Sequence, residues 1–363
     1  MKISYICPTN YVRRPISELS SMLANQGDSI IVAYPFSKKY STKGWAPNIK
    51  IETENKVQIE HISSWYISSL RYNITKPLAT LQSMKRIFKS DIVHLWEYWY
   101  PLSVFVILYA FITKQRNKLI MTTDGIVGYS YNPKKPWWLV PIFKIYTKTI
   151  GQLLFKIPIQ LTTYGKSMLP YAKKARFPMN KLSIYGTGIN ISKFNNINVN
   201  KIKKLKKGFN IKETDQTIIF VGMLTERKGI STVIKVAKML LEKSNNIKIL
   251  IVGDAHGPNI YLDQVQEKYK DKIIFTGGRT DIPELMKLAD CLLLPSEGEG
   301  LPGVVMEAMA AGTACVATNE GCTPDLIDSG VNGFLVEHKN VEEYTKAVRN
   351  ILNNPKLYGD KAF

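Results

Sequence analysis

The sequence predicts an α/β protein with two domains, each a doubly wound parallel sheet with helices on both faces. Short apolar segments of strand length alternate with segments whose apolar residues recur at helical spacing, and this alternation runs through the chain twice. The length of 363 residues and the hydrophobic content of 45% are enough for two separate cores. We place the boundary after residue 190, so the expected domains are 1–190 and 191–363.

The first series of elements is a strand–helix–strand pattern that occurs twice before residue 123. Its expected strands are Ile3–Cys7, Ser29–Tyr34, Asp91–Leu95 and Lys118–Thr122, and its expected helices are residues 16–27 and Leu102–Ile112. Strands that are joined through helices pair in parallel, because the helix carries the chain back to the starting edge of the sheet.

The second series begins after the basic, Asn-rich segment Asn195–Lys207. Its expected strands are Thr217–Val221, Ile247–Val252, Lys272–Thr276, Cys291–Leu294 and Ala314–Ala317, and its expected helices are Gly229–Leu241 and Gly303–Ala311. In sheets of this kind, ligands bind beyond the carboxyl ends of the strands. The loops that follow these strands are therefore where a site is expected.

The net charge of +20 is concentrated in the first half of the chain. Residues 1–195 carry 27 Lys and Arg against 8 Asp and Glu, residues 196–363 carry 22 against 21, and no acidic residue occurs from Gly125 to Lys212. Such a field attracts an anionic partner, which is a nucleic acid, an anionic membrane surface or a phosphorylated acceptor. A drift in composition is the alternative, but it should have affected both halves.

The cysteine and histidine content argues against a disulfide framework and against a metal site. Four cysteines without a CxxC pair are typical of reduced thiols, and the four histidines are scattered along the chain. The N-terminal residues do not have the pattern of a secretory signal, and no apolar run reaches the roughly 18 residues of a spanning helix. We therefore expect a cytoplasmic location and no bound metal.

One segment of the first half, Pro136–Thr163, mixes Trp, Phe, Ile and Leu with lysines. It is either a packed helix whose lysines reach past apolar surface to water, or a basic, aromatic surface that faces a membrane.

The loop Gly222–Gly229 follows a predicted strand and precedes a predicted helix. Gly222 permits a tight turn, and Arg227 and Lys228 lie just before the helix. Cations beside a helix N-terminus bind phosphate well, because the free N–H groups and the helix dipole also favour negative charge. A solvated basic loop is the alternative.

A second loop, at residues 297–303, leads into the expected helix Gly303–Ala311. Pro302 suits the start of a helix because it has no N–H to lose. Gly300 and Gly303 would let backbone N–H groups approach a phosphate closely.

Two carboxylates lie on either side of the start of this helix. Glu299 is in the loop, and Glu307 is about one turn inside the helix. A carboxylate can accept two hydroxyl hydrogen bonds, which suits the vicinal diol of a ribose. The alternative is two exposed glutamates near a helix start, where negative charge is favourable in any case.

Together these motifs resemble the family-4 retaining glycosyltransferases, whose GT-B fold has two Rossmann-like domains facing a cleft. The resemblance covers most of the chain, and its specific mark is the pair Glu299 and Glu307 with seven residues between them. The matching segments are VGMLTERKG (221–229), IVGDAHGP (251–258), IIFTGG (273–278), LADCLLLPSEGEGLPGVVMEAMAAGTACVAT (288–318), GCTPDLI (321–327) and GVNGFLV (330–336).

The resemblance implies a role for each matching position. Lys228 would bind the diphosphate of a nucleotide-sugar donor, Glu299 would contact the hydroxyls of the donor sugar, and Glu307 would hold the ribose. The loop with Arg279 and Thr280 would lie near the nucleobase. The positions that would border the diphosphate and the sugar are Gly222, Gly300, Leu301, Pro302, Gly303 and Val304.

The resemblance also implies the course of the reaction. The diphosphate would leave from the face on which the acceptor attacks, so the sugar would keep its configuration. No metal and no cofactor other than the donor is implied, because cations and the helix dipole neutralise the diphosphate.

The chain departs from the family pattern in several places. Met223 replaces the usual arginine after the strand-ending glycine, and we expect Arg227 to supply the missing cation. The segment Pro8–Arg14 replaces a frequent glycine pair, and its two arginines would partly replace that loop's phosphate contacts. Asp124 replaces a frequent histidine and would bond a sugar hydroxyl. His94, which we place after a strand, matches a frequent family histidine or is a core residue.

The sequence ends at Phe363, whereas family members usually continue for several tens of residues. We expect either a truncated end or an abbreviated crossover to the first domain.

The expected function is transfer of a sugar from a UDP- or GDP-sugar to a lipid-linked or other anionic glycan. The acceptor would be held by the cationic first domain, with Asp124 and His94 on its side of the cleft, and the protein would lie on the inner face of the membrane. The alternatives are a GT-B nucleotide-sugar epimerase or phosphorylase, and a basic nucleic-acid-binding protein. The near-neutral second half with its nucleotide-sugar motifs does not fit the last of these, so no nucleic-acid partner is expected.

Overall fold

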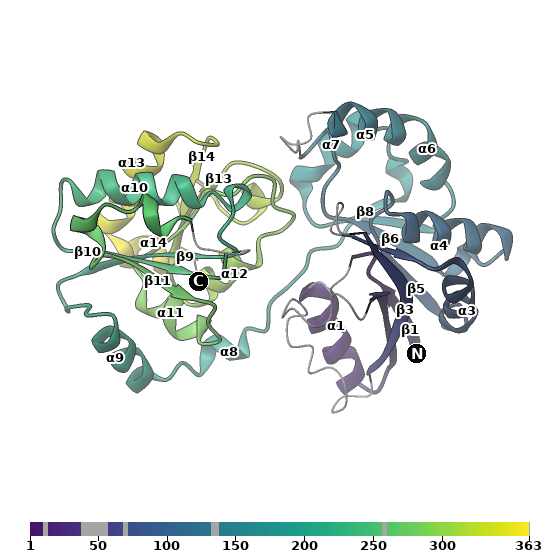
Figure 1. The fold of residues 1–363 in the computed structure, drawn as a ribbon, viewed down its shortest axis with the longest axis horizontal. Coiled ribbons are helices and arrows are strands. Elements are labelled where there is room, and N and C mark those ends of the chain that lie inside the picture. The colour runs from purple at the N-terminus through teal and green to yellow at the C-terminus, as the bar shows by residue number, and fades with distance from the viewer. Residues whose placement is uncertain (10–13, 38–56, 68–71, 132–137, 256–259, 363) are drawn as a thin grey trace. The chain divides into compact units, whose positions relative to one another are not determined.

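The chain divides into two α/β units, Met1–Thr187 and Gly188–Phe363, in the computed structural model (Figure 1). The structure describes residues 1–9, 14–37, 57–67, 72–131, 138–255 and 260–362. Each unit is built on a largely parallel sheet, which confirms the predicted fold class. The division falls after residue 187, whereas the sequence placed it after residue 190.

The first unit has an eight-stranded sheet in the order β4-β3-β2-β1-β5-β6-β7-β8. Its strands are β1 (Lys2–Ile6), β2 (Ser29–Phe36), β3 (Val57–Ile67), β4 (Tyr72–Thr75), β5 (Ile92–Trp96), β6 (Leu119–Thr123), β7 (Gln160–Thr163) and β8 (Leu182–Ile184). Its helices are α1 (Arg14–Asn25), α3 (Pro77–Ile87), α4 (Pro101–Ile112), α5 (Leu139–Lys148), α6 (Ile150–Leu154) and α7 (Leu169–Lys174). This sheet is parallel except at its edge, where β4 pairs with β3 antiparallel.

Strand β1 shows why helices cover both faces of this sheet. Alternate residues of a strand point to opposite faces. Ile3, Tyr5 and Cys7 pack with Ile16 of α1 in one apolar cluster. From the other face, the hydroxyl of Ser4 donates to the carbonyl of residue 87, the last residue of α3 (3.3 Å). Figure 1 shows α1 and α3 on opposite sides of the strands.

The second unit has a six-stranded, fully parallel sheet in the order β11-β10-β9-β12-β13-β14. Its strands are β9 (Gln216–Val221), β10 (Ile247–Val252), β11 (Ile273–Gly277), β12 (Cys291–Leu294), β13 (Ala314–Thr318) and β14 (Gly333–Val336). Its helices are α8 (Ser192–Asn195), α9 (Val199–Gly208), α10 (Ile230–Leu241), α11 (Ile282–Leu288), α12 (Gly303–Ala310), α13 (Val341–Asn353) and α14 (Pro355–Ala362).

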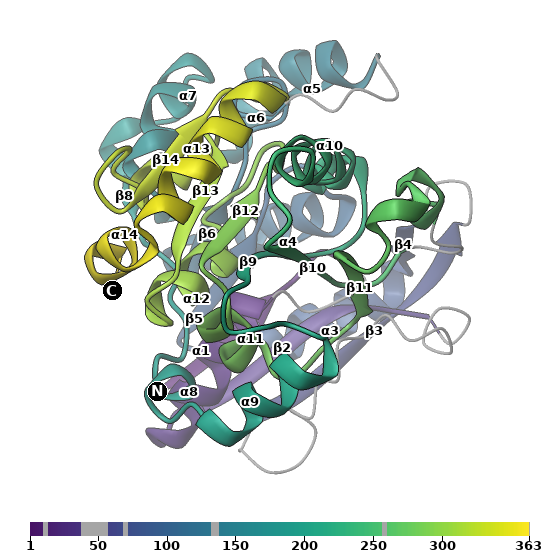
Figure 2. The same ribbon diagram turned by 90° about the vertical axis from the view of Figure 1, so that its left-hand side faces the viewer.

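The helices of this unit form two layers around the sheet. Helices α10 and α13 pack together on one side, and α9 and α11 pack together on the other (Figures 1 and 2). Every residue of β10 is buried, as expected for a strand with helices over both of its faces. The strand order changes direction between β9 and β12, because β10 and β11 lie on one side of β9 and the later strands lie on the other. Loops that leave such a switch point diverge and leave room for a ligand.

The segment Pro136–Thr163 is not the packed helix of its first sequence interpretation. From residue 138 it forms α5 and α6 and then the strand β7. Helix α5 buries only Thr147, so it is not a packed core helix. Within the described parts of the chain, no helix combines the length and the apolar character needed to cross a membrane. Residues 10–13 of the predicted loop Pro8–Arg14 lie outside the described residues.

Candidate functional site

The loop after β9 carries the two predicted phosphate-binding cations. A short 3-10 turn, η4 (Glu226–Lys228), follows the strand, and the hydroxyl of Thr225 accepts a hydrogen bond from the Lys228 N–H (3.3 Å). Gly229, at φ 77°, is the N-cap residue of α10. A Cβ at Gly229 would lie 2.1 Å from the carbonyl oxygen of Pro295, so only glycine lets this loop lie against the loop after β12.

Backbone and side-chain hydrogen bonds join these two loops. The Glu297 N–H donates to the Arg227 carbonyl (2.7 Å), and the Arg227 guanidinium donates to the Glu297 carbonyl (3.4 Å). Strands β9 and β12 are neighbours in the sheet, so their loops leave the same edge side by side. The predicted proximity of the two motifs is therefore present in the structure.

Glu299 lies between the two cations. Its Oε1 is 2.5 Å from Lys228 Nζ and 3.9 Å from Arg227 Nη1. The Glu299 and Lys228 side chains are 13% and 18% exposed, whereas Arg227 is 40% exposed, so Lys228 is the more sheltered cation. Burial raises the pKa of Glu299, but the Lys228 and Arg227 charges and hydrogen bonds from Lys228 and Ser296 outweigh it. The pKa of Glu299 is therefore below its usual value, and the group is ionised at neutral pH.

The loop after β13 contacts the main chain on both sides of Glu299. Gly298 N–H donates to the Glu320 carboxylate (3.0 Å), and Cys322 N–H donates to the Gly300 carbonyl (2.9 Å). Gly321 has φ 61°, and a Cβ there would lie 1.7 Å from the Glu299 carbonyl oxygen. The main chain on both sides of Glu299 is therefore fixed by direct backbone contact.

Helix α12 starts at the predicted residue, Gly303, directly after this loop. Its N-cap residue is Pro302, which makes no side-chain capping hydrogen bond. The first N–H groups of a helix have no partner within the helix, so the N-terminus of α12 suits an anion. Leu301 and Val304 are half-buried beside it, and Glu307 is half-buried on the helix one turn further on.

The carboxylates of Asp254 and Asp281 hold the loop after β11, which was predicted to lie near a nucleobase. Gly278 N–H donates to Asp254 Oδ1 (2.8 Å), and the Asp254 carbonyl accepts from Leu224 N–H (3.0 Å). Asp254 therefore connects the loops after β9, β10 and β11. No role was predicted for Asp254, although it directly follows the glycine after a strand.

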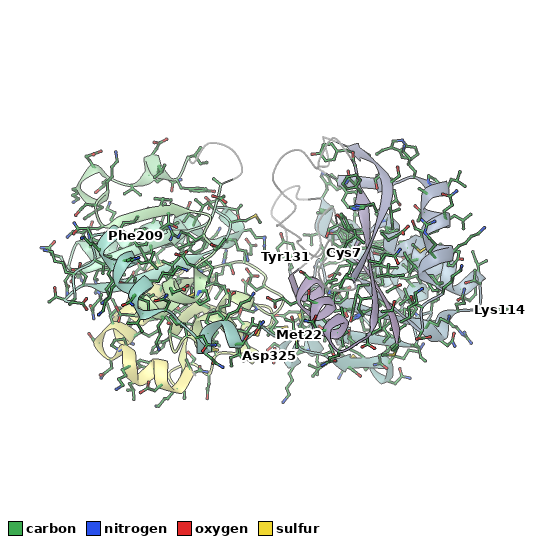
Figure 3. The ribbon with its side chains drawn as sticks, turned by 90° about the horizontal axis from the view of Figure 1, so that it is seen from below. Cys7, Met22, Lys114, Tyr131, Phe209 and Asp325 are labelled. Atoms are coloured by element: carbon green, nitrogen blue, oxygen red, sulfur yellow. The ribbon has the colours of Figure 1, made fainter. Side chains whose placement is uncertain are left out.

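The Arg279 side chain is engaged within this loop. Its Nε and Nη2 donate to the two carboxylate oxygens of Asp281 (2.8 and 2.6 Å), and these bonds lower the pKa of Asp281. The Arg279 guanidinium also lies 5.7 Å from the ring centre of Phe209, which Figure 3 labels. Thr280, the next residue, is exposed. A role of Arg279 and Thr280 near a base remains a prediction.

His94 lies within β5, which corrects its expected place after the strand. Its ring is 9% exposed, stacks on Trp96 with 4.1 Å between ring centres, and shares a hydrogen bond with the Thr122 hydroxyl (2.6 Å). Burial lowers the pKa of His94 to about 3, so the imidazole is neutral at physiological pH. These contacts favour the core-residue interpretation over an acceptor-side role.

Asp124 follows β6 at the carboxyl edge of the first sheet, as expected from the sequence. Its backbone N–H donates to the Glu97 carboxylate (3.1 Å), which lies at the end of the neighbouring strand β5. Glu97 is buried, and the sequence analysis did not select it. The available signal was its position directly after a buried strand, on the same edge as Asp124.

Comparison with known proteins finds glycosyltransferases. Residues 201–360 match the family model described as Glycosyl transferases group 1. An uncharacterized glycosyltransferase of Haemophilus influenzae is 34% identical over 163 residues, 44% of this chain and 43% of that protein. The UDP-Gal:alpha-D-GlcNAc-diphosphoundecaprenol alpha-1,3-galactosyltransferase of Escherichia coli is 28% identical over 183 residues, 49% of this chain and 46% of that protein. The chain spans less than half the length of these two curated relatives.

A solved structure is similar over both units. Anabaena Alr3699/HepE in complex with UDP and glucose matches 100% of this chain and 93% of its own, with a TM-score of 0.76 and 16% sequence identity. At this identity the likeness shows the fold alone. Residues 201–360 therefore resemble the glycosyl transferases group 1 family, and the two α/β units of the chain have the GT-B fold.

Proposed function

We propose that the protein is a family-4 retaining glycosyltransferase that moves a sugar from a UDP- or GDP-sugar to a lipid-linked or other anionic glycan. The observation that carries the proposal is the convergence of Lys228, Arg227 and Glu299 beside the N-terminus of α12. Two cations, a helix N-terminus and an ionised carboxylate together complement a diphosphate joined to a polyhydroxylated ring.

Each group has a task in the proposed reaction. Lys228 moves from Glu299 to the diphosphate and stabilises the negative charge that grows on it as the sugar bond breaks. Glu299 then accepts hydrogen bonds from the sugar hydroxyls, and its lowered pKa keeps it in the accepting form. The first N–H groups of α12 bind the diphosphate, and Glu307 holds the ribose. The acceptor attacks from the face that the diphosphate leaves, so the configuration is retained.

The similar proteins support the proposed substrates. The Escherichia coli relative is named for a UDP-galactose donor and a GlcNAc-diphosphoundecaprenol acceptor, and the Anabaena protein binds UDP and glucose. The excess of cations in residues 1–195 suits a diphosphate-linked acceptor. A GT-B epimerase or phosphorylase remains the alternative within the fold.

UDP or GDP is expected to raise the melting temperature of the protein, because a ligand that binds only the folded state stabilises it. A thermal-shift series with UDP, GDP, their glucose derivatives and a single-stranded oligonucleotide measures this. A matched series on Lys228→Ala is expected to show a smaller shift at the same nucleotide concentration. A shift with the oligonucleotide and none with any nucleotide would instead favour the nucleic-acid-binding alternative.

We also propose that the first unit binds the inner face of the membrane peripherally. Its helices α4, α5 and α6 expose large apolar side chains, and α6 contacts both of the others. The exposed residues are Leu108, Phe111, Ile112, Ile142, Ile145, Ile150 and Leu153. Lysines accompany them, among them Lys114, which Figure 3 shows extending from the end of α4. Apolar side chains with neighbouring cations suit an anionic bilayer surface.

Leu153→Asp is expected to weaken binding to vesicles that contain anionic phospholipid by about tenfold or more, because it removes an apolar contact and adds a repelled charge. Vesicle co-sedimentation at low and high salt measures this, and binding of the wild type should fall as salt rises. Leu357→Asp is the matched control, since Leu357 is 49% exposed but lies in the second unit. Absence of wild-type binding at low salt would contradict the membrane proposal and leave the transferase proposal intact.

A further inference from the structure

Glu97 is a buried carboxylate in an unfavourable backbone conformation. It is the first residue after β5, only 2% of it is exposed, and its φ of 64° lies in the left-handed region. A residue with a Cβ is disfavoured there, and burying a carboxylate is costly as well. Residues held in such conformations concentrate at functional sites, where the surrounding structure fixes them.

Three hydrogen bonds of Glu97 go to the end of the neighbouring strand. Its Oε2 accepts from the Thr123 hydroxyl (3.0 Å), and its Oε1 accepts from the Asp124 N–H (3.1 Å). Its own N–H donates to the Thr122 carbonyl (2.8 Å). One side chain therefore spans the turn in which β6 ends, and the left-handed φ directs the carboxylate toward that turn.

We propose that Glu97 is a positioning residue that fixes Asp124 at the carboxyl edge of the first sheet. This inference rests on the proposed function and on the sequence prediction that Asp124 bonds a sugar hydroxyl on the acceptor side. The two oxygens of Glu97 bond the Thr123 hydroxyl and the N–H of the Thr123–Asp124 peptide, so this peptide cannot rotate without breaking a bond. Glu97 acts through Asp124 and does not itself touch the substrate.

Three substitutions separate this role from a purely structural one. Glu97→Gln keeps the shape and one accepting oxygen, Glu97→Ala removes both oxygens, and Glu97→Gly removes them while relieving the left-handed φ. We expect the glycine variant to melt at a higher temperature than the alanine variant, and yet both to lose function. If transfer activity falls equally in both variants although their melting temperatures differ, Glu97 acts by positioning and not only by stabilising the fold.

The first readout is amide hydrogen exchange of the backbone at residues 123–128. In the alanine and glycine variants, we expect exchange about tenfold faster than in the wild type, because a hydrogen bond is lost. The second readout is transfer from UDP-sugars to GlcNAc-diphospho-undecaprenol. We expect kcat/KM for this acceptor to fall about 10- to 100-fold in both variants, with UDP affinity unchanged and the glutamine variant closer to the wild type.

Wild-type exchange and wild-type transfer in Glu97→Gly would overturn the proposal. A fall in UDP affinity as large as the fall in transfer would also overturn it, since it would indicate a general structural defect. If the wild-type protein neither binds UDP-sugars nor transfers to this acceptor, the proposed function is contradicted. The exchange measurement would then decide alone whether Glu97 holds the turn.

Discussion

Lys228→Ala is expected to lower kcat for sugar transfer about 100-fold or more and to weaken UDP binding about tenfold. The reason is that Lys228 is the sheltered cation at the N-terminus of α12 and would carry most of the stabilisation of the leaving diphosphate. Initial rates of UDP release and calorimetric UDP titration measure the two effects. Arg227→Ala should cause the smaller loss, because its side chain is more exposed and more screened by solvent.

The matched control is Lys235→Ala, since Lys235 is an exposed lysine of the adjacent helix α10. It is expected to leave both rate and affinity unchanged. Equal effects of Lys228→Ala and Lys235→Ala would mean that the site depends on general positive charge and not on the placed cation. A Lys228→Ala variant with normal UDP affinity and normal rate would contradict the proposed site outright.

Gly321→Ala is expected to lower the free energy of unfolding by about 2–4 kcal/mol and to weaken nucleotide binding. The added Cβ would lie 1.7 Å from the Glu299 carbonyl oxygen, so the backbone that holds Glu299 has to move. Urea unfolding followed by fluorescence gives the stability, and UDP titration of the same samples gives the effect on the site.

Gly330→Ala is the control for backbone strain alone. Gly330 also has a left-handed φ, 85°, but no atom lies within 4 Å of the position of an added Cβ. We expect it to cost about 1–2 kcal/mol and to leave UDP binding unchanged. Similar losses in the two variants would mean that the contact between Gly321 and Glu299 is not what holds the loop.

The strands β10 and β12 of the second unit were predictable because they are buried on both faces. Such strands appear in the sequence as uninterrupted apolar runs, and β10 and β12 were placed with their observed ends. The start of α12 was predictable from Pro302 and its glycine neighbours. The edge of the first sheet was not, since an antiparallel pairing such as that of β3 and β4 depends on contacts that no local pattern records.

The site was predictable where neighbouring strands bring motifs to one edge, as with Lys228 and Glu299. The site was less predictable where the role of a residue depends on its backbone conformation or on a partner that is distant in the sequence. Glu97 accepts hydrogen bonds from residues 26 and 27 positions away in the sequence. Its left-handed φ is also not expected for a glutamate. The expected strand Asp91–Leu95 already contained His94, so the expectation that His94 follows the strand was inconsistent with it, and β5 extends one residue further, to Trp96.

The pairing of Lys228 with Glu299 would give the proposed donor site a way to select among anions. A bare phosphate would draw the lysine away and leave the glutamate facing a second negative charge. A free hexose would donate hydrogen bonds to Glu299 but would offer no negative charge to Lys228. Only a molecule that offers an anion and hydroxyl donors together satisfies both side chains at once, so the intact donor should be held more tightly than the spent nucleotide, which favours turnover.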